Sequence, residues 1–418
     1  MEILRLRSNK ISNINNLENF YFKELKTLNL SYNNISDITV LEKVKFDKSP
    51  KLELGGNDIP NINILENANF KELKELDISD NNISDIKVLE KVKFDKLEIL
   101  NLKDNQISDI NVLENVKFEK LEFLDLSGNG FENIEVLEKV NFKELKSLNL
   151  TGNNISDIEV LEKVKFKELK DLNLYYNLIK DIKVLEKVNF GKLEKLNLGK
   201  NKIENINVLE KVKFKELKEL YLHNVMEGYY KIQTSIKFKK LEILYFNNNK
   251  ITNINLLKEL SFNELKELNL SCNMISDISS LKQIKFNKLE ILNLSNNKIF
   301  DINILENINF KVLKELYLHH NIISNIKVLG KVKFEKLEKL FLNFNNIYDI
   351  DILEKINLKE LKELHLDNNA ITDIKVFDKI RYEKLKLNKL YLANNKIDFN
   401  KLSKTILLLK SKIKYFYY

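Results

Sequence analysis

The sequence contains very little cysteine, proline or tryptophan. Its 418 residues include one cysteine, Cys272, two prolines and no tryptophan. A single cysteine excludes an internal disulfide framework, so the fold does not depend on an oxidising compartment. The sequence also has no apolar run approaching about 18 residues, the length that a membrane-spanning helix requires.

The N-terminus lacks a basic segment followed by an apolar run, so no signal peptide is expected. This predicts a cytoplasmic location, or a nuclear one. Secretion would be expected only if the N-terminus is incomplete.

Motifs of common catalytic and metal sites are also missing. The sequence has no G-x-x-x-x-G-K-[ST] phosphate loop and no C-x-x-C or H-E-x-x-H zinc pattern. His319 and His320 are adjacent, and we expect neighbouring residues near a strand end to face opposite ways rather than to share a metal. The sequence therefore predicts no enzymatic activity, no cofactor, no metal site and no small-molecule substrate.

Charge of one sign is not concentrated anywhere. Lys and Arg number 69 and Asp and Glu number 61, which gives a net charge of +8. The two signs alternate locally, as in the segment FKELKEL, so no long tract produces a strong field. This pattern favours a solvated, mixed-charge surface over a nucleic-acid or membrane partner.

The sequence is dominated by a 24-residue repeat with the frame L-x-x-L-x-L-x-x-N, followed by x-Ile-x-x-Ile. Residues 25–33, LKTLNLSYN, are one copy. The final position of the frame is Asn in all copies but one, and the last copy follows at a spacing of 26. These positions are Asn9, Asn33, Asn57, Asn81, Asn105, Asn129, Asn153, Asn177, Asn201, Val225, Asn249, Asn273, Asn297, Asn321, Asn345, Asn369 and Asn395.

This frame resembles the leucine-rich repeat family. The resemblance implies an α/β fold: a curved, horseshoe-like leucine-rich repeat solenoid. A parallel β-sheet would line the concave face, with short helices or helical turns on the convex face. Residues 1–397 would form this domain, with about 17 repeats and irregular stretches at 49–60 and 223–238. We expect a local strand distortion at the first of these stretches.

Within one repeat, each residue type has an expected role. Leu28 and Leu30 alternate with polar residues, which predicts a short strand with the leucines inside. The repeated Asn should bond backbone groups at the end of the strand. A helical turn or short helix is expected at residues 40–46, preceded by an Asx residue that caps it, as at Asp37. A Phe that recurs once per repeat should form an aromatic column in the core.

Residues 398–418 are predicted to form a C-terminal capping helix and an aromatic tail. Leu402, Ile406, Leu409 and Ile413 fall at helical spacing, and Asn400 is the expected N-cap. A basic amphipathic helix could alternatively lie on a membrane surface, but the end of a solenoid requires a cap.

The concave face is expected to carry the function. In the column between the two strand leucines, the first half of the chain is mostly Asn, Asp or Glu, and the second half becomes aromatic. Exposed aromatic residues often dominate the binding energy of protein interfaces. The candidate partner-binding residues are Tyr221, His223, Tyr245, Tyr317, His319, Phe341, Phe344, His365 and Tyr391. Codon drift is the alternative, because Asn, Tyr and His codons differ by one base.

The sequence thus predicts a protein-interaction scaffold that binds a protein partner through its concave face, chiefly the aromatic C-terminal half. Two alternatives remain open. The I-x-x-I-x-x-L tail of the repeat resembles bacterial internalins, which implies an adhesin or effector acting on a protein of a host or neighbouring cell. It also resembles regulators of protein phosphatase 1, which implies a regulatory subunit. Both groups usually have slightly shorter repeats than this chain.

Overall fold

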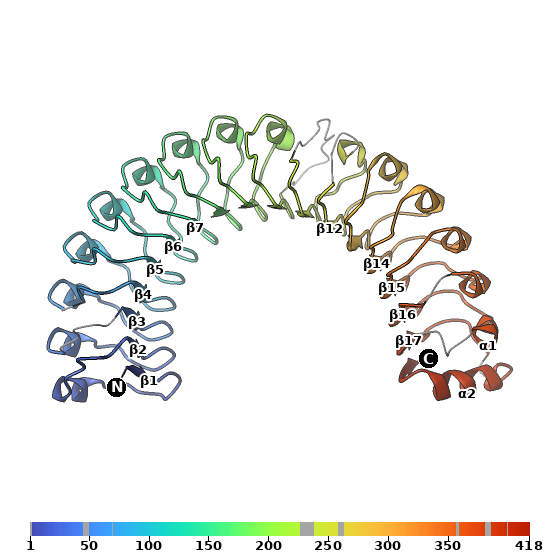
Figure 1. Ribbon diagram of the computed structural model, residues 1–418, viewed down its shortest axis with the longest axis horizontal. Helices are drawn as coiled ribbons and strands as arrows, with labels where there is room; N and C mark the ends of the chain where they lie inside the picture. The colour runs from blue at the N-terminus through green and yellow to red at the C-terminus, as the bar shows by residue number, and fades with distance from the viewer. Residues whose placement is uncertain are drawn as a thin grey trace. The chain divides into compact units, whose positions relative to one another are not determined.

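The computed structural model describes residues 2–44, 50–68, 70–225, 238–257, 263–356, 359–380, 386–398 and 400–418. Two compact units divide the chain, unit 1 at Met1–Glu216 and unit 2 at Leu217–Tyr418. In each unit, parallel strands line the inner, concave side and short helices line the outer, convex side (Figure 1). No described helix is long and apolar enough to span a membrane.

Unit 1 consists of three-residue strands, each followed by a 3-10 helix. The strands are β1 (Ile3–Arg5), β2 (Thr27–Asn29), β3 (Lys51–Glu53), β4 (Glu75–Asp77), β5 (Ile99–Asn101), β6 (Phe123–Asp125), β7 (Ser147–Asn149), β8 (Asp171–Asn173) and β9 (Lys195–Asn197). The 3-10 helices are η1 (Asn15–Asn19), η2 (Thr39–Glu42), η3 (Asn63–Glu66), η4 (Lys87–Glu90), η5 (Asn111–Glu114), η6 (Glu135–Glu138), η7 (Glu159–Glu162), η8 (Lys183–Glu186) and η9 (Ile206–Glu210).

Unit 2 continues the pattern and ends with two α-helices and one further strand. Its strands are β10 (Glu219–Tyr221), β11 (Ile243–Tyr245), β12 (Glu267–Asn269), β13 (Ile291–Asn293), β14 (Glu315–Tyr317), β15 (Lys339–Phe341), β16 (Glu363–His365), β17 (Lys389–Tyr391) and β18 (Tyr415–Tyr417). Its helices are η10 (Asn255–Leu257), η11 (Ser279–Gln283), η12 (Asn303–Asn307), η13 (Lys327–Gly330), η14 (Asp351–Glu354), α1 (Val376–Lys379) and α2 (Ser403–Lys412).

Neighbouring strands pair in parallel with a constant register. Thr27 lies opposite Lys51, for example, and Leu28 opposite Leu52, so equivalent residues of successive repeats form columns across the sheet. Because side chains alternate between the faces of a strand, Leu28 and Leu30 are buried as predicted, with exposed fractions of 1% and 0%. The predicted distortion at residues 49–60 is wrong for β3, which keeps the same register with β2 and β4. Ser49 lies outside the described residues.

The repeated Asn residues form the predicted hydrogen-bonded column. The Asn33 side chain accepts hydrogen bonds from the Asn9 and Ile11 N–H groups, at 2.9 and 3.0 Å, through its Oδ1. Its Nδ2 donates to the carbonyls of Leu6 and Leu30, both at 2.8 Å. Each amide therefore joins two successive repeats and satisfies backbone groups that would otherwise be buried without partners. Val225, where the sequence lacks Asn, is fully buried.

The convex segments are 3-10 helices rather than α-helices in most repeats. In η2 the Leu41 N–H donates to Ile38 O at 3.0 Å, the three-residue spacing of this helix type. The predicted Asx cap is confirmed, because Asp37 Oδ1 accepts from the Thr39 N–H at 2.8 Å. Hydrogen bonds to Thr39 lower the pKa of the Asp37 carboxyl.

The phenylalanine column is confirmed where the chain is described. Phe94 and Phe118 are buried and stack with ring centroids 6.5 Å apart. Phe310 and Phe334 stack in the same way in unit 2, at 6.1 Å. Positions 46, 262, 358 and 382 of this column lie outside the described residues, as does most of the irregular stretch at 223–238.

The C-terminal helix exists, but two of its details differ from the prediction. Leu402, Ile406, Leu409 and Ile413 are buried as expected. However, Asn400 is not the N-cap of α2, which begins at Ser403. Asp398 instead accepts hydrogen bonds from the Asn400 and Lys401 N–H groups, both at 3.2 Å. A carboxylate two residues earlier therefore stabilises the turn that enters the helix.

The aromatic tail is a strand of the sheet, which the sequence did not predict. β18 pairs in parallel with β17, so that Leu390 lies opposite Phe416 and Tyr391 opposite Tyr417. The tail thereby extends the concave face of unit 2 by one strand.

Candidate functional site

In unit 1 the concave column of Asn and Asp residues has a structural role. Each side-chain Oδ1 accepts a hydrogen bond from the backbone N–H two residues later, where the strand ends. The distances are 3.0 Å from Ser79 N–H to Asp77 and 3.1 Å from Thr151 N–H to Asn149. Asn101, Asp125, Asn173 and Asn197 make the same contact. The sequence pattern indicated only an exposed surface at this column.

In unit 2 aromatic residues replace that acceptor at several strands. Asn269 and Asn293 retain it, at 3.0 Å from the Ser271 and Ser295 N–H groups. Tyr317, Phe341 and Tyr391 have a ring at the same position, which cannot accept this hydrogen bond. An intramolecular hydrogen bond contributes about 1 kcal/mol to stability, so these substitutions are not neutral for the fold.

Five rings of unit 2 stack face to face across five consecutive strands. We call this group the ring ladder, and it consists of Tyr317, Phe341, His365, Tyr391 and Tyr417. Successive ring centroids are 4.6, 4.3, 4.0 and 4.5 Å apart, with interplanar angles of 23° or less. Such stacking contributes about 0.5 to 1.5 kcal/mol per pair beyond area burial, which offsets the lost hydrogen bonds.

Tyr417 is the one member of the ring ladder that was not among the predicted site residues. Its sequence separation from Tyr391 equals the separation of Tyr391 from His365. This repeated spacing was the signal that could have placed the tail in the column.

Three further rings, those of His319, His320 and Phe344, continue the aromatic surface of the ring ladder over one edge of the concave face. His319 contacts Tyr317 and Phe341 edge to face, both with centroids 6.0 Å apart. His320 stacks on Phe344 at 4.1 Å, and Phe344 is 42% exposed. The rings of His319 and His320 contact each other at 5.7 Å, so the expectation that they face opposite ways is wrong. The reason is the left-handed conformation of His320, with φ of 52°.

Burial keeps His319 uncharged near neutral pH. Its Nδ1 is buried and has no hydrogen-bond partner among the described residues. Desolvation, with smaller contributions from His320 and His365, lowers the pKa of His319 to about 4. His319 therefore contributes an uncharged aromatic ring to the surface beside the ring ladder at pH 7.

The carboxylates beside the ring ladder are paired with lysines. Glu315 accepts from Lys339 Nζ at 2.8 Å and from the Tyr317 hydroxyl. Glu363 contacts Lys389 Nζ at 3.3 Å and His365 Nε2 at 2.8 Å. Burial alone would raise the pKa of both carboxyls, but these hydrogen bonds outweigh it and lower both values.

Tyr221 and Tyr245 form a separate pair on β10 and β11. Their ring centroids are 5.1 Å apart and nearly perpendicular, at 72°. The Tyr221 hydroxyl donates to Glu219 at 2.9 Å, and the Tyr245 hydroxyl donates to Glu267 at 2.6 Å. Burial, followed by these carboxylates, raises the pKa of both hydroxyls.

The predicted site residues therefore fall into two groups. Tyr317, His319, Phe341, His365 and Tyr391 lie together, with Phe344 beside them through His320. Tyr221 and Tyr245 are separated from them by β12 and β13, which carry Asn269 and Asn293 in the column. His223 is half-buried on the strand end of β10, two residues after Tyr221.

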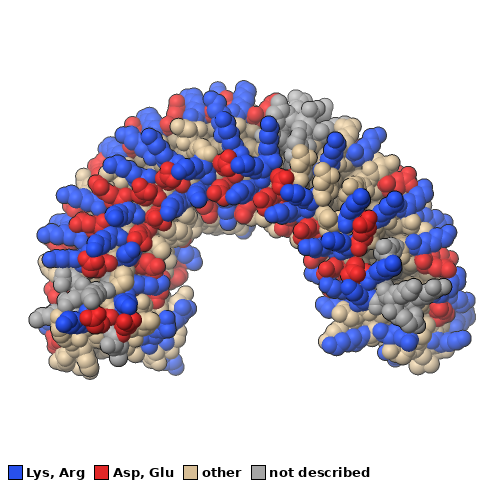
Figure 2. Space-filling model, viewed as in Figure 1, with Lys and Arg blue, Asp and Glu red and all other residues tan. Residues whose placement is uncertain are grey.

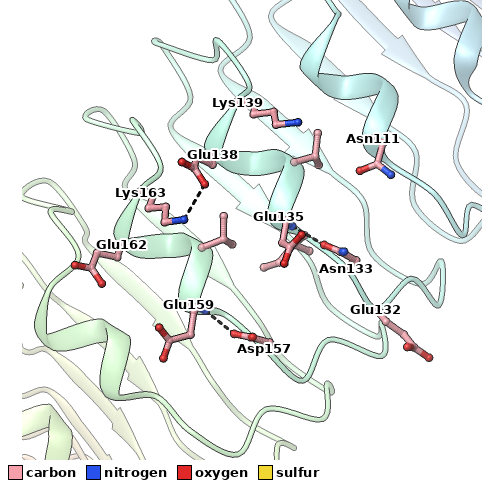
Figure 3. Close-up of a pocket in the computed structure, with 13 residues that line it drawn as sticks. Asn111, Glu132, Asn133, Glu135, Glu138, Lys139, Asp157, Glu159, Glu162 and Lys163 are labelled. Atoms are coloured by element: carbon pink, nitrogen blue, oxygen red, sulfur yellow. Dashed lines mark hydrogen bonds and ion pairs between the residues drawn. The ribbon is translucent and has the colours of Figure 1, made fainter.

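The convex side of unit 1 carries a groove of about 620 Å³ along η6 and η7. Figure 3 shows Glu135 and Glu159 on these successive helices, with Lys163 reaching Glu138 at 3.1 Å. The Lys163 contact repeats an ion pair found between other successive repeats, such as Lys139 with Glu114 at 2.7 Å. These interactions stabilise the stack, and no group of His, Cys, Asp and Glu among the described residues is suited to hold a metal.

Charges of both signs cover the visible surface, as the sequence predicted. Figure 2 shows Lys and Arg side chains interspersed with Asp and Glu across each unit. The lysines and glutamates pair between successive repeats at short distances, such as 2.6 Å for Lys266 with Glu242 and for Lys314 with Glu290.

Family models match segments spread along the chain. Models described as leucine-rich repeats match residues 143–187, 239–283 and 335–379 as pairs of repeats, and also 71–131 and 24–38. The chain belongs to the leucine-rich repeat family. This assignment confirms the resemblance seen in the sequence.

Solved structures give the same leucine-rich repeat fold. An internalin of Listeria monocytogenes is 27% identical, with a TM-score of 0.59, over 84% of this chain and 88% of the internalin. A leucine-rich repeat protein of Leptospira interrogans matches at 22% identity and a TM-score of 0.55, over 99% and 95% of the two chains. The ectodomain of an Arabidopsis thaliana receptor kinase, solved in complex with CASPARIAN STRIP INTEGRITY FACTOR 2, matches at 21% identity and 0.57 over 92% of this chain and 49% of that chain.

None of the curated proteins matches the chain. The leucine-rich repeat assignment supports a protein-interaction scaffold, because solenoids of this kind present extended concave surfaces for binding.

Proposed function

We propose that the protein is an interaction scaffold that binds a protein partner through the concave face of unit 2, chiefly through the ring ladder. The observation that carries this proposal is the unbroken stack from Tyr317 to Tyr417. Large, rigid aromatic side chains at the centre of an interface supply most of its binding energy. His319, His320 and Phe344 extend this surface over the edge of the concave face.

Codon drift, in which Asn residues of the column change to Tyr or His without a functional reason, accounts poorly for this arrangement. The Asn and Asp side chains of unit 1 close their strands with a hydrogen bond, and random replacement by a ring would lose it. In unit 2 the replacements occur on consecutive strands, where each new ring stacks on the last. A continuous patch of this kind on a protein surface normally marks a binding site.

The proposal also covers enzymatic activity, the kind of partner and the cellular location. We propose that the protein has no enzymatic activity and acts with a protein rather than with nucleic acid or a membrane. A cytoplasmic location also belongs to the proposal. A regulatory subunit of a phosphatase is a narrower form of the same scaffold function.

The second candidate function is an internalin-like adhesin or effector that binds a protein of a host or neighbouring cell. The 27% identity to a Listeria monocytogenes internalin over most of both chains favours it. An upstream signal sequence in the gene would support this candidate, whereas its absence would favour the intracellular scaffold.

The test replaces two rings by the residue that the repeat otherwise uses. Tyr317→Asn with Phe341→Asn should restore the strand-end hydrogen bonds, so the fold should survive while the ring ladder is interrupted. The full chain, as wild type and as variant, is used to capture partners from the source cell. We expect the variant to lose the partner that wild type captures, with an unchanged melting temperature.

A matched control removes aromatic surface elsewhere. Phe300 and Tyr348 are each 61% exposed and lie outside the concave columns. Phe300→Ala with Tyr348→Ala should capture the partner as wild type does. If the double Asn variant also captures the partner as well as wild type, the ring ladder is not the site.

A further inference from the structure

The C-terminal end of unit 2 departs from the mixed charge seen along the repeats. Residues 400–418 contain no Asp or Glu and five lysines, which are Lys401, Lys404, Lys410, Lys412 and Lys414. Lys401 pairs with Asp398 at 3.2 Å, and the other four lysines make no ion pair among the described residues. Lysines of the repeats differ, since they pair with glutamates of the neighbouring repeat, as Lys362 does with Glu338 at 2.6 Å. This end of the unit therefore carries positive charge without a carboxylate partner in the described chain.

Helix α2 lies across the end of unit 2 and turns its charged side away from the core (Figure 1). The apolar residues along its inner side are at most 7% exposed, and they are Leu402, Ile406, Leu409 and Ile413. Thr405 Oγ1 donates to Asp378 Oδ2 of α1 at 2.9 Å, which fixes the rotation of the helix. Lys404, Leu407 and Lys410 are spaced three residues apart, so they share the opposite side. The side chain of Leu407 is 66% exposed there.

Two tyrosine rings restrict the lysines of this surface. Lys410 Nζ lies 4.8 Å from the centroid of the Tyr418 ring, which places the end of β18 beside α2. Lys414 Nζ lies 4.9 Å from the centroid of the Tyr415 ring, and Tyr415 is 42% exposed. A ring face attracts an ammonium group without using all of its three N–H donors. The lysines are therefore held in place while donors remain for a bound anion, which reduces the entropy that binding costs.

We propose that this surface binds an acidic polypeptide segment of another protein. We call it the basic face, and it consists of Lys404, Leu407, Lys410, Lys414 and Tyr415. Carboxylates of the segment pair with the three lysines, and an apolar side chain of the segment packs on Leu407. This second binding surface goes beyond the proposed function and does not depend on the ring ladder.

The chain itself shows how such groups are neutralised. Lys314 pairs with Glu290 of the preceding repeat at 2.6 Å, and the Tyr245 hydroxyl donates to Glu267 of the next strand at 2.6 Å. An acidic segment placed against the basic face would supply the same carboxylates to its lysines and to the Tyr415 hydroxyl. Charge complementarity therefore identifies the occupant, and charged hydrogen bonds of this kind are stronger than neutral ones.

Other occupants fit the basic face less well. An amphipathic helix on a membrane inserts its apolar stripe, but the stripe of α2 is already buried in the protein. Leu407 alone would add about 1.5 to 3 kcal/mol on full burial, which is too little for stable insertion. Nucleic acid needs many phosphate contacts to stay bound at physiological salt, and three lysines provide few. A second copy that docks the same face is opposed by repulsion between the lysines.

The test uses a fluorescein-labelled peptide with glutamates on both sides of a central leucine. Its matched probe has glutamine in place of every glutamate, which keeps the size but removes the charge. Binding to the full chain is measured by fluorescence anisotropy. We expect saturable binding of the glutamate peptide with a dissociation constant on the order of 100 µM, and at least about tenfold weaker binding of the glutamine peptide.

Variants locate the binding. Lys404→Gln combined with Lys410→Gln and Lys414→Gln should weaken the glutamate peptide at least about tenfold, because the carboxylates lose their partners. Leu407→Ser should weaken it at least about threefold through the lost apolar contact. All four side chains are exposed, so the melting temperature should stay that of wild type.

A matched control removes the same amount of charge from unit 1. Lys93, Lys117 and Lys165 are exposed and make no ion pair among the described residues. Lys93→Gln combined with Lys117→Gln and Lys165→Gln should leave the affinity for the glutamate peptide unchanged. An equal loss in this control would overturn the proposal, because it would show attraction by net charge alone.

Equal binding of the glutamate and glutamine peptides would also overturn the proposal, as would no saturable binding or an unchanged affinity in the triple variant of the basic face. Vesicles of phosphatidylcholine with phosphatidylserine and a single-stranded DNA oligonucleotide test the other anions. Tighter binding of either than of the glutamate peptide, lost in the same variant, would replace the acidic segment by a membrane or a nucleic acid. The Tyr317→Asn, Phe341→Asn variant should bind the glutamate peptide as wild type does, and a loss there would contradict a separate surface.

Discussion

The two units have one backbone plan but use the same concave column differently. In unit 1 the column holds side chains with an oxygen that closes the end of the strand, as Asp77 and Asn149 do. In the second half of unit 2 it holds rings that contact one another instead of the backbone. The comparison shows that a position with a structural hydrogen bond can be reassigned when the new side chains stabilise each other.

The comparison also separates contacts that recur along the stack from contacts that occur at one place. The strand-end hydrogen bonds of unit 1 recur at nearly the same distances where the column holds Asn or Asp, so they describe how the stack holds together. The ring ladder and the Tyr221–Tyr245 pair occur once each within the described residues. Binding specificity is therefore expected where the columns change character.

The largest expected effect is on partner binding when the centre of the ring ladder is removed. Phe341→Asn with His365→Asn should weaken the binding of the partner by at least about 3 kcal/mol, which raises the dissociation constant more than about 100-fold. The reason is that central aromatic residues act as hot spots of binding energy. Calorimetric titration of the purified pair measures this. Asn149→Ala in unit 1 is the counterpart, and a comparable loss there would erase the distinction between the two columns.

The second effect is on stability in unit 1. Asp125 is 7% exposed and accepts from Ser127 N–H, Ser127 Oγ and Asn149 Nδ2, at 2.9, 2.6 and 2.9 Å. Asp125→Ala should lower the free energy of unfolding by about 1 to 3 kcal/mol, because it leaves these donors without partners. Hydrogen exchange of residues 123–129 measures the local loss. Exchange as slow as in wild type would mean that the column has no structural role.

The third effect is a pH dependence of stability that arises from His319 in unit 2. Because the pKa of His319 falls to about 4 in the folded chain, the unfolded chain binds this proton more readily. Stability should therefore be lost as the pH falls from about 6.5 to about 4, and the loss should be smaller in His319→Asn. NMR titration of the four histidines checks this, and a His319 midpoint at or above 6 contradicts the buried, neutral ring.

The smallest effect is expected on the convex side of unit 1. Lys163 and Glu138 are 3.1 Å apart, and their side chains are 63% and 46% exposed. Lys163→Ala should change the free energy of unfolding by no more than about 1 kcal/mol, since solvent screens such pairs. A thermal unfolding scan with and without salt measures this change. A loss as large as that of Asp125→Ala would show that the convex ion pairs stabilise the fold as much as the concave column does.

Most of the fold follows from the sequence because its determinants lie within one repeat. The alternation at Leu28 and Leu30, the Asn33 amide and the Asp37 cap are all local patterns, and each recurs from one repeat to the next. The type of convex helix was not predictable in the same way, because a segment of about four residues forms a 3-10 helix as readily as one α-helical turn. The cap at Asp398 rather than Asn400 depends on the path of the chain into α2.

The site was predictable as a set of exposed aromatic residues, but not as a structure. That Tyr317 stacks on Phe341 while Tyr221 meets Tyr245 edge to face depends on side-chain rotamers that the sequence does not specify. Tyr417 was missed because the tail lacks the leucine frame that marks the other strands. The structural role of the unit 1 column was also hidden, since its hydrogen bonds go to the backbone.

The most direct test of the central claim is hydrogen exchange of the full chain with and without its captured partner. The account predicts that binding slows exchange in residues 315–320, 339–344, 363–368 and 389–394 of unit 2. The equivalent positions of β5 to β8 in unit 1 should be unchanged. Protection confined to unit 1, or to the convex helices of either unit, would contradict the assignment of the ring ladder as the binding surface.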